Sequence, residues 1–192
     1  MDILGNIFEW IIFLTIIIAL IYTMIVVKEE KSSFRESAVP IEFKGFKFLI
    51  PSWWGKYINE NSDEIIFQRD DTRYEWQATL KWISTTPNQT IEEKYKDLIS
   101  SKKIEFDLDQ SIIHKSELLF KNKKMQSNNF EAIRIEGTAT QDQQDRIYYD
   151  AYLIKDKIKN GFLFAESKSS VLNGMVEGPY FEEVLSNIST IE

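Results

Sequence analysis

A long apolar run stands near the start of the chain, from Ile7 to Val27, with the sequence IFEWIIFLTIIIALIYTMIVV. A single charge, that of Glu9, interrupts it. About 20 apolar residues at 1.5 Å per residue match a hydrocarbon core about 30 Å thick. The pattern therefore predicts an N-terminal tail and a single transmembrane helix within residues 1–27, with the rest of the chain outside the bilayer.

This helix is predicted to be retained as a single-pass anchor in an inner membrane. A cleaved signal peptide has a basic start and a small-residue cleavage site, whereas this run has an acidic start and ends in Tyr-Thr-Met-Ile-Val-Val. Lys28, Lys31 and Arg35 follow the span and no basic residue precedes it. The positive-inside rule then favours a soluble domain on the cytoplasmic face. A periplasmic or other extracytoplasmic domain is the alternative, since small anchored domains often work there.

Glu9 and Trp10 lie at the N-terminal end of the predicted span. Ionisable residues inside a membrane usually serve a function, but near the end of a span such a group reaches water or headgroups easily. Two interpretations follow for Glu9: an ordinary interfacial carboxylate, or a contact with a polar residue of another membrane subunit. Trp10 is either an interfacial aromatic or part of the same contact.

Beyond the span, the pattern changes twice. Residues 28–40, KEEKSSFRESAVP, are charged, rich in serine and closed by proline, which predicts a short juxtamembrane linker that is helical at first. Residues 41–192 then alternate apolar and polar positions repeatedly, as strands do. In the clearest case alternate residues share one face: Tyr74, Trp76, Ala78, Leu80 and Trp82. The predicted strands are 41–50 (one bent strand or two short ones), 64–69, 74–83, 115–120, 129–137, 146–154 and 161–167.

Two helices are predicted among these strands. Thr90 and Glu93 have the spacing of a capping box, and apolar residues follow at helical intervals as far as Ile99. The second helix, YFEEVLSNI, follows Gly178, with Pro179 in its first turn. Runs of strands separated by only two principal helices predict an α+β domain with a mainly antiparallel sheet.

The order of these elements resembles the PsbP/Mog1/DcrB-like superfamily. The residues that carry the resemblance are the strand that runs into a Pro-Ser-Trp corner (46–54), the helix 92–100, the strands 131–137 and 146–154, GFLFAES, and the closing VLSNI. The resemblance covers residues 41–188 and implies an α/β/α sandwich whose relatives are mostly adaptors. It implies a binding role and transfers no site residue. An uncleaved helix here takes the place of the lipobox or signal peptide found in that superfamily.

No motif in the chain predicts catalysis, a cofactor, a metal site or a small-molecule substrate. There is no cysteine, and the one histidine, His114, lies beside a predicted strand, where a structural role is favoured. The segment from Asp107 to Ser111 begins like a calcium loop, but Ile112 replaces the required glycine and Leu118 the bidentate glutamate. The net charge of −7 also argues against nucleic-acid binding.

Two consecutive tryptophans, Trp53 and Trp54, follow Pro51. In an extended segment they cannot both point inward, so one of them must be at least partly exposed. Exposed aromatic residues are typical of protein contacts and of membrane surfaces. Trp53, Trp54 and Tyr57 are therefore predicted to form a protein-interaction patch.

The function that follows is a membrane-anchored, non-catalytic binding module, acting as an accessory or assembly subunit of a bacterial membrane or envelope complex. Its predicted partners are the membrane and other membrane or envelope proteins. One alternative is a chaperone or immunity-type protein that binds hydrophobic segments of a client, which requires an exposed apolar groove. A second alternative is a carboxylate-dependent enzyme, which requires two acidic side chains that converge in a pocket.

Overall fold

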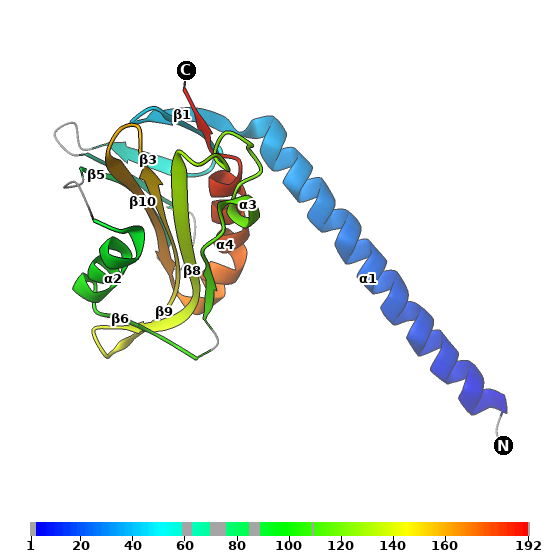
Figure 1. Cartoon of the computed structure of the whole chain (residues 1–192). Helices are drawn as coiled ribbons and strands as arrows, with labels where there is room; N and C mark the ends of the chain where they lie inside the picture. Colours follow the sequence, from blue (N-terminus) through cyan, green and yellow to red (C-terminus); the bar gives the residue numbers. More distant parts are fainter. Residues whose placement is uncertain (1–2, 59–62, 70–75, 85–88, 109, 192) are drawn as a thin grey trace. The chain divides into compact units, whose positions relative to one another are not determined.

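The chain forms two compact units, residues 1–38 and residues 39–192, in a computed structural model that describes residues 3–58, 63–69, 76–84, 89–108 and 110–191 (Figure 1). The predicted face of strand 74–83 thus lies partly outside the described residues, because Tyr74 is not among them.

The first unit is a single helix, α1, Ile3–Ser37. Its residues Glu9–Val26 form one helix long and apolar enough to cross a membrane, and none of that stretch is buried. Two threonines within it donate their hydroxyls to the carbonyls four residues earlier, Thr15 to Ile11 and Thr23 to Ala19, each at 2.8 Å. Polar groups satisfied within the helix are what a hydrocarbon environment requires. The helix continues through most of the segment predicted as a linker, since no proline interrupts it before Pro40.

The second unit is built on an antiparallel sheet of eight strands. Their order is β3-β4-β5-β10-β9-β8-β6, and β7 pairs with β8 beside β6. The strands are β3 Gly55–Ile58, β4 Glu64–Gln68, β5 Trp76–Ser84, β6 Ile104–Phe106, β7 Ser111–Ile113, β8 Phe130–Gln141, β9 Asp145–Asp156 and β10 Gly161–Ser169.

A smaller sheet of three strands contains β1 (Val39–Phe43), β2 (Phe46–Ile50) and β11 (Ser189–Thr190). The segment 41–50 therefore forms two strands rather than one bent strand. Lys44 and Gly45 connect them with φ of 51° and 80°. Two successive residues with positive φ are what a tight two-residue hairpin turn requires, and glycine adopts that conformation at no steric cost.

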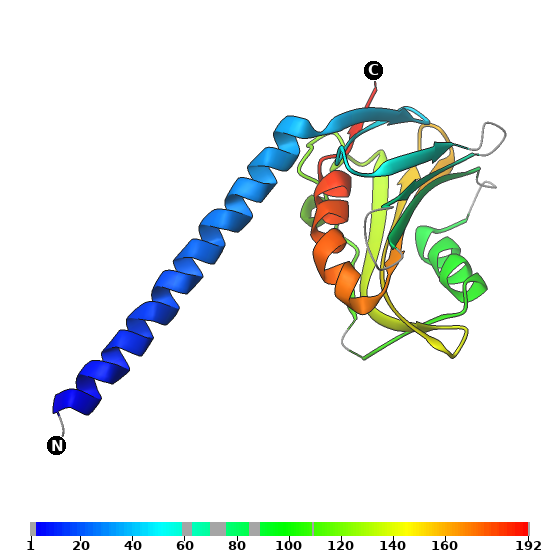
Figure 2. The same ribbon diagram turned by 180° about the vertical axis from the view of Figure 1, so that it is seen from behind.

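Two helices cover opposite faces of the large sheet (Figures 1 and 2). Helix α2, Ile91–Ser101, packs on β8 and β9 and has the predicted capping box, with Thr90 accepting from the amide of Glu93 and Glu93 accepting from that of Thr90. Helix α4, Val171–Ser186, packs mainly on β9 and β10. The predicted α/β/α sandwich around a mainly antiparallel sheet is confirmed.

Two predicted elements are wrong in detail. Residues 115–120 do not form a strand: Ser116–Leu119 is the short helix α3. Helix α4 begins at Val171, with Ser170 as its N-cap, so Pro179 lies in its interior and not in its first turn. Proline there removes the hydrogen bond to the carbonyl of Met175. Met175 and Pro179 are both exposed, so water can satisfy that carbonyl.

Candidate functional site

Trp54 belongs to the core and not to a surface patch, which corrects its place among the predicted interaction residues. Its ring centroid lies 4.4 Å from that of Trp76, and its indole Nε1 donates to Glu177 Oε2 at 3.0 Å. Glu177 is itself fully buried and also accepts from Arg69 Nη1. An indole nitrogen buried with a hydrogen-bond partner is the usual arrangement for tryptophan.

Trp53 and Tyr57 lie on different sides of the large sheet. Trp53 is half-buried and meets Tyr180 of α4 edge-on, with ring centroids 5.1 Å apart. Tyr57 is exposed and stands opposite Ile66, which stands opposite Thr79. Directly opposite residues in antiparallel strands point to the same face. The pairing continues from Thr79 through Glu166 to Ala151, which packs in the core beneath α2, so Tyr57 lies on the face covered by α2. One patch containing Trp53, Trp54 and Tyr57 therefore does not form.

Glu9 and Trp10 are exposed on α1, where Trp10 meets Phe13 edge-on at 6.0 Å between ring centroids. Their contact with another membrane protein stays a prediction.

An exposed apolar stripe runs along the N-terminal half of α4. Leu172, Met175 and Val176 are exposed by 65%, 70% and 55%, and Pro179 is exposed beside them. The spacing of these four residues places them on one side of a helix. We call these four residues the α4 stripe.

The opposite side of α4 is pressed closely onto the sheet. A Cβ added to Gly174 would lie 2.4 Å from atoms of the Tyr148 side chain, so only glycine fits there. Farther along, Phe181 and Leu185 are fully buried. The buried side also contains Asn173 and Glu177, so the exposed stripe is the more apolar side of the N-terminal half of the helix.

The protein itself covers the outer side of α4 only toward the C-terminus. There Lys121 Nζ lies 2.6 Å from Glu183 Oε2, and the amide of Lys121 donates to the carbonyl of Ser186 at 2.8 Å. Glu183 and Ser186 are buried as a result. The α4 stripe is thus the half of this outer side that no described residue covers.

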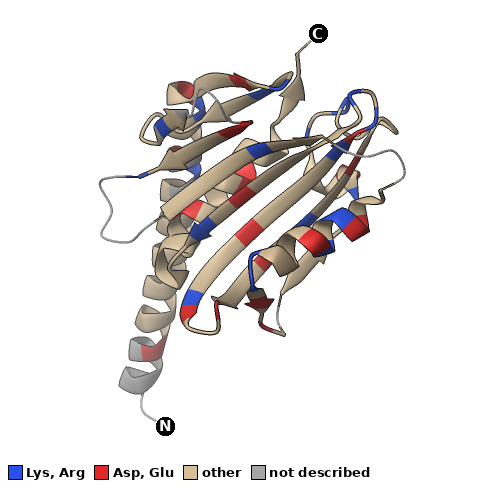
Figure 3. Cartoon of the chain, turned by 90° about the vertical axis from the view of Figure 1, so that its left-hand side faces the viewer, with Lys and Arg blue, Asp and Glu red and all other residues tan. Residues whose placement is uncertain are grey.

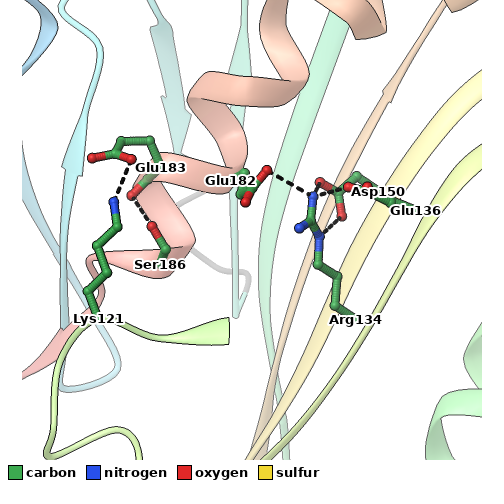
Figure 4. A network of polar contacts seen from close by, with 7 residues as sticks. All are labelled: Lys121, Arg134, Glu136, Asp150, Glu182, Glu183 and Ser186. Atoms are coloured by element: carbon green, nitrogen blue, oxygen red, sulfur yellow. Dashed lines mark hydrogen bonds and ion pairs between the residues drawn. The ribbon is translucent and has the colours of Figure 1, made fainter. Parts of the chain in front are cut away.

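A buried ion-pair cluster lies between α4 and the sheet (Figure 4). Arg134 of β8 is 5% exposed and donates Nε and Nη2 to the two carboxylate oxygens of Asp150 on β9, each at 3.0 Å. Nη2 also contacts Glu136 and lies 3.5 Å from Glu182 Oε2 of α4. The guanidinium carbon lies 5.0 Å from the ring centroid of Tyr152. These contacts fix the arginine in one orientation.

Burial and charge oppose each other in this cluster. Burial raises the pKa of Asp150 to about 7, and the attraction of Arg134 only partly offsets this effect. Burial also disfavours the charged form of Arg134, but the charge and hydrogen bonds of Asp150, together with Tyr152 and Glu136, outweigh that penalty and hold the arginine pKa above its ordinary value. Arg134 is therefore a permanent buried cation.

A pocket of about 460 Å³ opens beside Arg134. We call it the Arg134 pocket; it is lined by Glu117, Leu118, Leu119, Phe120, Lys121, Gln126, Arg134, Tyr152, Glu182, Glu183 and Ser186. Three glutamates thus converge there, as the carboxylate-enzyme alternative requires. Glu183 pairs closely with Lys121, however, and Glu182 lies near Arg134. Carboxylates next to cations form ion pairs, and we assign them no catalytic role.

A second pocket, of about 230 Å³, lies on the other face of the sheet, beside the C-terminal end of α2. Lys102 Nζ lies 2.7 Å from Glu166 Oε1, and the hydroxyl of Tyr149 donates to the other oxygen of Glu166. Figure 3 shows basic and acidic residues interspersed along the strands of this face and along α2. Among the described residues, no three His, Asp or Glu side chains are placed to hold a metal ion.

No protein-family model and no curated protein matches this sequence. Solved structures do match the fold. PsbP (CyanoP) of the cyanobacterium Synechocystis has a TM-score of 0.54 at 10% identity, over 80% of this chain and 92% of that one. The Ran-binding protein Mog1p of Saccharomyces cerevisiae has a TM-score of 0.50 at 7% identity, over 81% and 96%. The chain therefore has a PsbP/Mog1-like fold, as its sequence resemblance implied.

Proposed function

We propose that this protein is a membrane-anchored, non-catalytic binding module that takes up a protein partner on the α4 stripe. The observation that carries the proposal is that one side of α4 packs on the sheet while the apolar stripe on the other side is exposed and not covered by the described part of residues 39–192. An apolar surface on a helix, bordered by aromatic residues, is the usual centre of a protein–protein contact. Trp53 and Tyr180 stand at that border.

The anchor supports a role beside other membrane proteins. Helix α1 holds its apolar stretch Glu9–Val26, and the first strand of the domain begins at Val39. About a dozen residues at 1.5 Å each span about 20 Å, so the domain works within that reach of the bilayer. We propose an accessory or assembly subunit of a membrane or envelope complex in an inner membrane, with the domain on the cytoplasmic side. Glu9 and Trp10 are the proposed contact within the membrane.

The shape of the surface favours a folded partner over a hydrophobic client. A chaperone for unfolded or membrane segments needs an apolar groove that surrounds them. The α4 stripe lies instead on the outer side of a helix, and the Arg134 pocket, to which α4 also contributes, includes five charged residues in its lining. The contact we propose is therefore with a complementary apolar surface that is already folded.

Purification of the full chain from its native membranes in mild detergent tests this proposal. The wild type is compared with Leu172→Glu/Met175→Glu, which places two charges on the stripe, and with Ile158→Glu. Ile158 is 69% exposed in the β9–β10 connection and provides a matched apolar control. We expect a stoichiometric partner with the wild type and the control and its loss with the double variant. An unchanged partner in all three, or a lone monomer in all three, contradicts the proposal.

A further inference from the structure

One nitrogen of Arg134 makes no hydrogen bond to the described residues. Nε and Nη2 donate to Asp150, and Nη2 also to Glu136 and Glu182, whereas Nη1 makes no hydrogen bond to a described residue. Arg134 lines its pocket, and in Figure 4 the unbonded nitrogen points away from Asp150, toward the side of Lys121 and Ser186. A guanidinium donor without a hydrogen bond at the wall of a pocket can donate to an acceptor that enters the pocket.

The charges around this pocket are unbalanced. Its lining contains two cations, Lys121 and Arg134, and three carboxylates, those of Glu117, Glu182 and Glu183. The carboxyl groups of Asp150 and Glu136 also contact this arginine, although neither residue lines the pocket. This excess of negative groups disfavours an anion and favours a cationic occupant.

One of these carboxylates is available to a ligand. Glu182 is 55% exposed at its side chain and contacts Arg134 only at 3.5 Å, whereas Glu183 is engaged with Lys121 at 2.6 Å. A donor from a ligand could therefore bind Glu182 without breaking a short ion pair. Leu118, Leu119 and Phe120 form an apolar wall of the same pocket.

We propose that the Arg134 pocket binds a primary ammonium group with an adjacent carbonyl oxygen, as found in free amino acids and at the amino terminus of a polypeptide. The ammonium group binds the carboxylate of Glu182, and the carbonyl oxygen accepts from Arg134 Nη1. The apolar side chain of the ligand packs on the wall formed by Leu118 and Phe120. This site is separate from the α4 stripe and does not depend on the function proposed for it.

Calorimetric titration of the full chain in detergent micelles tests the proposal with three probes. These are L-leucinamide, which has the ammonium and the carbonyl; N-acetyl-L-leucinamide, which lacks the ammonium; and L-leucine, which has a carboxylate. We expect L-leucinamide to bind with a Kd on the order of 1 mM or below, and the acetylated probe to bind at least about tenfold more weakly. L-Leucine binding as tightly as the amide indicates a free amino acid as the natural ligand, and weaker binding indicates a polypeptide terminus; either result supports the site.

Two variants locate the binding. Glu182→Gln removes the charge from an exposed side chain and should weaken L-leucinamide binding about tenfold. Glu105→Gln, which removes another exposed carboxylate, on β6, should leave it unchanged. Met175→Glu on the α4 stripe should also leave it unchanged, so failure of this site and failure of the proposed function are distinguishable. Absence of L-leucinamide binding, equal binding of the acetylated probe, or equal binding by Glu182→Gln and the wild type would overturn the proposal.

Discussion

Replacement of Arg134 by methionine should show how strongly the buried cluster depends on its one cation. The variant keeps the length and the apolar part of the side chain but leaves Asp150, which is fully buried, without its bidentate partner. Removal of one member of a buried ion pair costs about 3–5 kcal/mol, because the remaining charge has no compensation. We expect the free energy of unfolding to fall by about that amount at pH 8.

The pH dependence of the free energy of unfolding provides a second, independent test of this ion pair. Burial raises the pKa of Asp150 to about 7 from an ordinary 3.8, so the folded protein holds a proton there that the unfolded chain has lost. In the wild type this group lowers the free energy of unfolding as the pH rises from about 4 to about 7, with no further loss above that. Without Arg134 the pKa rises further and the loss continues above pH 7, at up to about 1.4 kcal/mol per pH unit. The cost of Arg134→Met should therefore be larger at pH 8 than at pH 6.

Urea unfolding of the full chain in detergent, followed by tryptophan fluorescence, measures both effects, since Trp54 and Trp76 are buried in the domain core. The double variant Arg134→Met/Asp150→Leu removes the buried charges together and should recover the wild-type stability to within about 1 kcal/mol. A cost below about 1 kcal/mol for the single variant, no recovery in the double variant, or a pH-independent cost would refute this account of the cluster.

Two further predictions concern contacts of α4. Trp54→Phe removes a donor to the buried carboxylate of Glu177, to which Arg69 also donates, and should cost about 1–3 kcal/mol in urea unfolding. A change within about 0.5 kcal/mol would show that this hydrogen bond adds little. Gly174→Ala should cost about 1–3 kcal/mol, since its Cβ would lie 2.4 Å from atoms of Tyr148. Gly178→Ala is the matched control, because its Cβ would lie 3.4 Å from the same ring and a helical alanine gains about 0.5–1 kcal/mol. Equal effects of the two glycine variants would contradict the close packing of α4 on the sheet.

Local signals in the sequence predicted the elements that depend on neighbouring residues. The capping box of Thr90 and Glu93 forms as predicted, because its partners are three residues apart. The alternation of Trp76, Ala78 and Leu80 predicted a strand with one buried face, and all three are buried. The start of α4 was missed for the opposite reason. Gly174 and Pro179 are breakers by local propensity, and close packing on Tyr148 overrides them.

Local sequence patterns could not predict the contact between Arg134 and Asp150. Arg134 and Asp150 meet through the pairing of β8 with β9, and no pattern within either strand specifies that register. One signal was present, since Asp150 interrupts the apolar run from Ile147 to Ile154. A charge inside a predicted buried strand requires a buried partner, but the partner itself could not be identified from the sequence.

The α4 stripe could not be predicted because the predicted helix began at Pro179 and not at Val171. Without the turns from Val171 onward, Leu172, Met175 and Val176 had no helix to lie on, and the two tryptophans became the more prominent aromatic feature. Trp53 contacts Tyr180 beside the stripe, so its role in a contact surface stays a prediction. Trp54 is buried and cannot take part in such a surface.

Site-specific photocrosslinking in native membranes tests the central claim most directly. A photoreactive amino acid is placed at Met175, on the α4 stripe, or at Ile158, which is equally exposed in the β9–β10 connection. The account predicts one discrete crosslinked protein adduct from position 175 and none from position 158. No adduct at position 175, or the same adducts from both positions, would contradict the claim that the α4 stripe binds a protein partner.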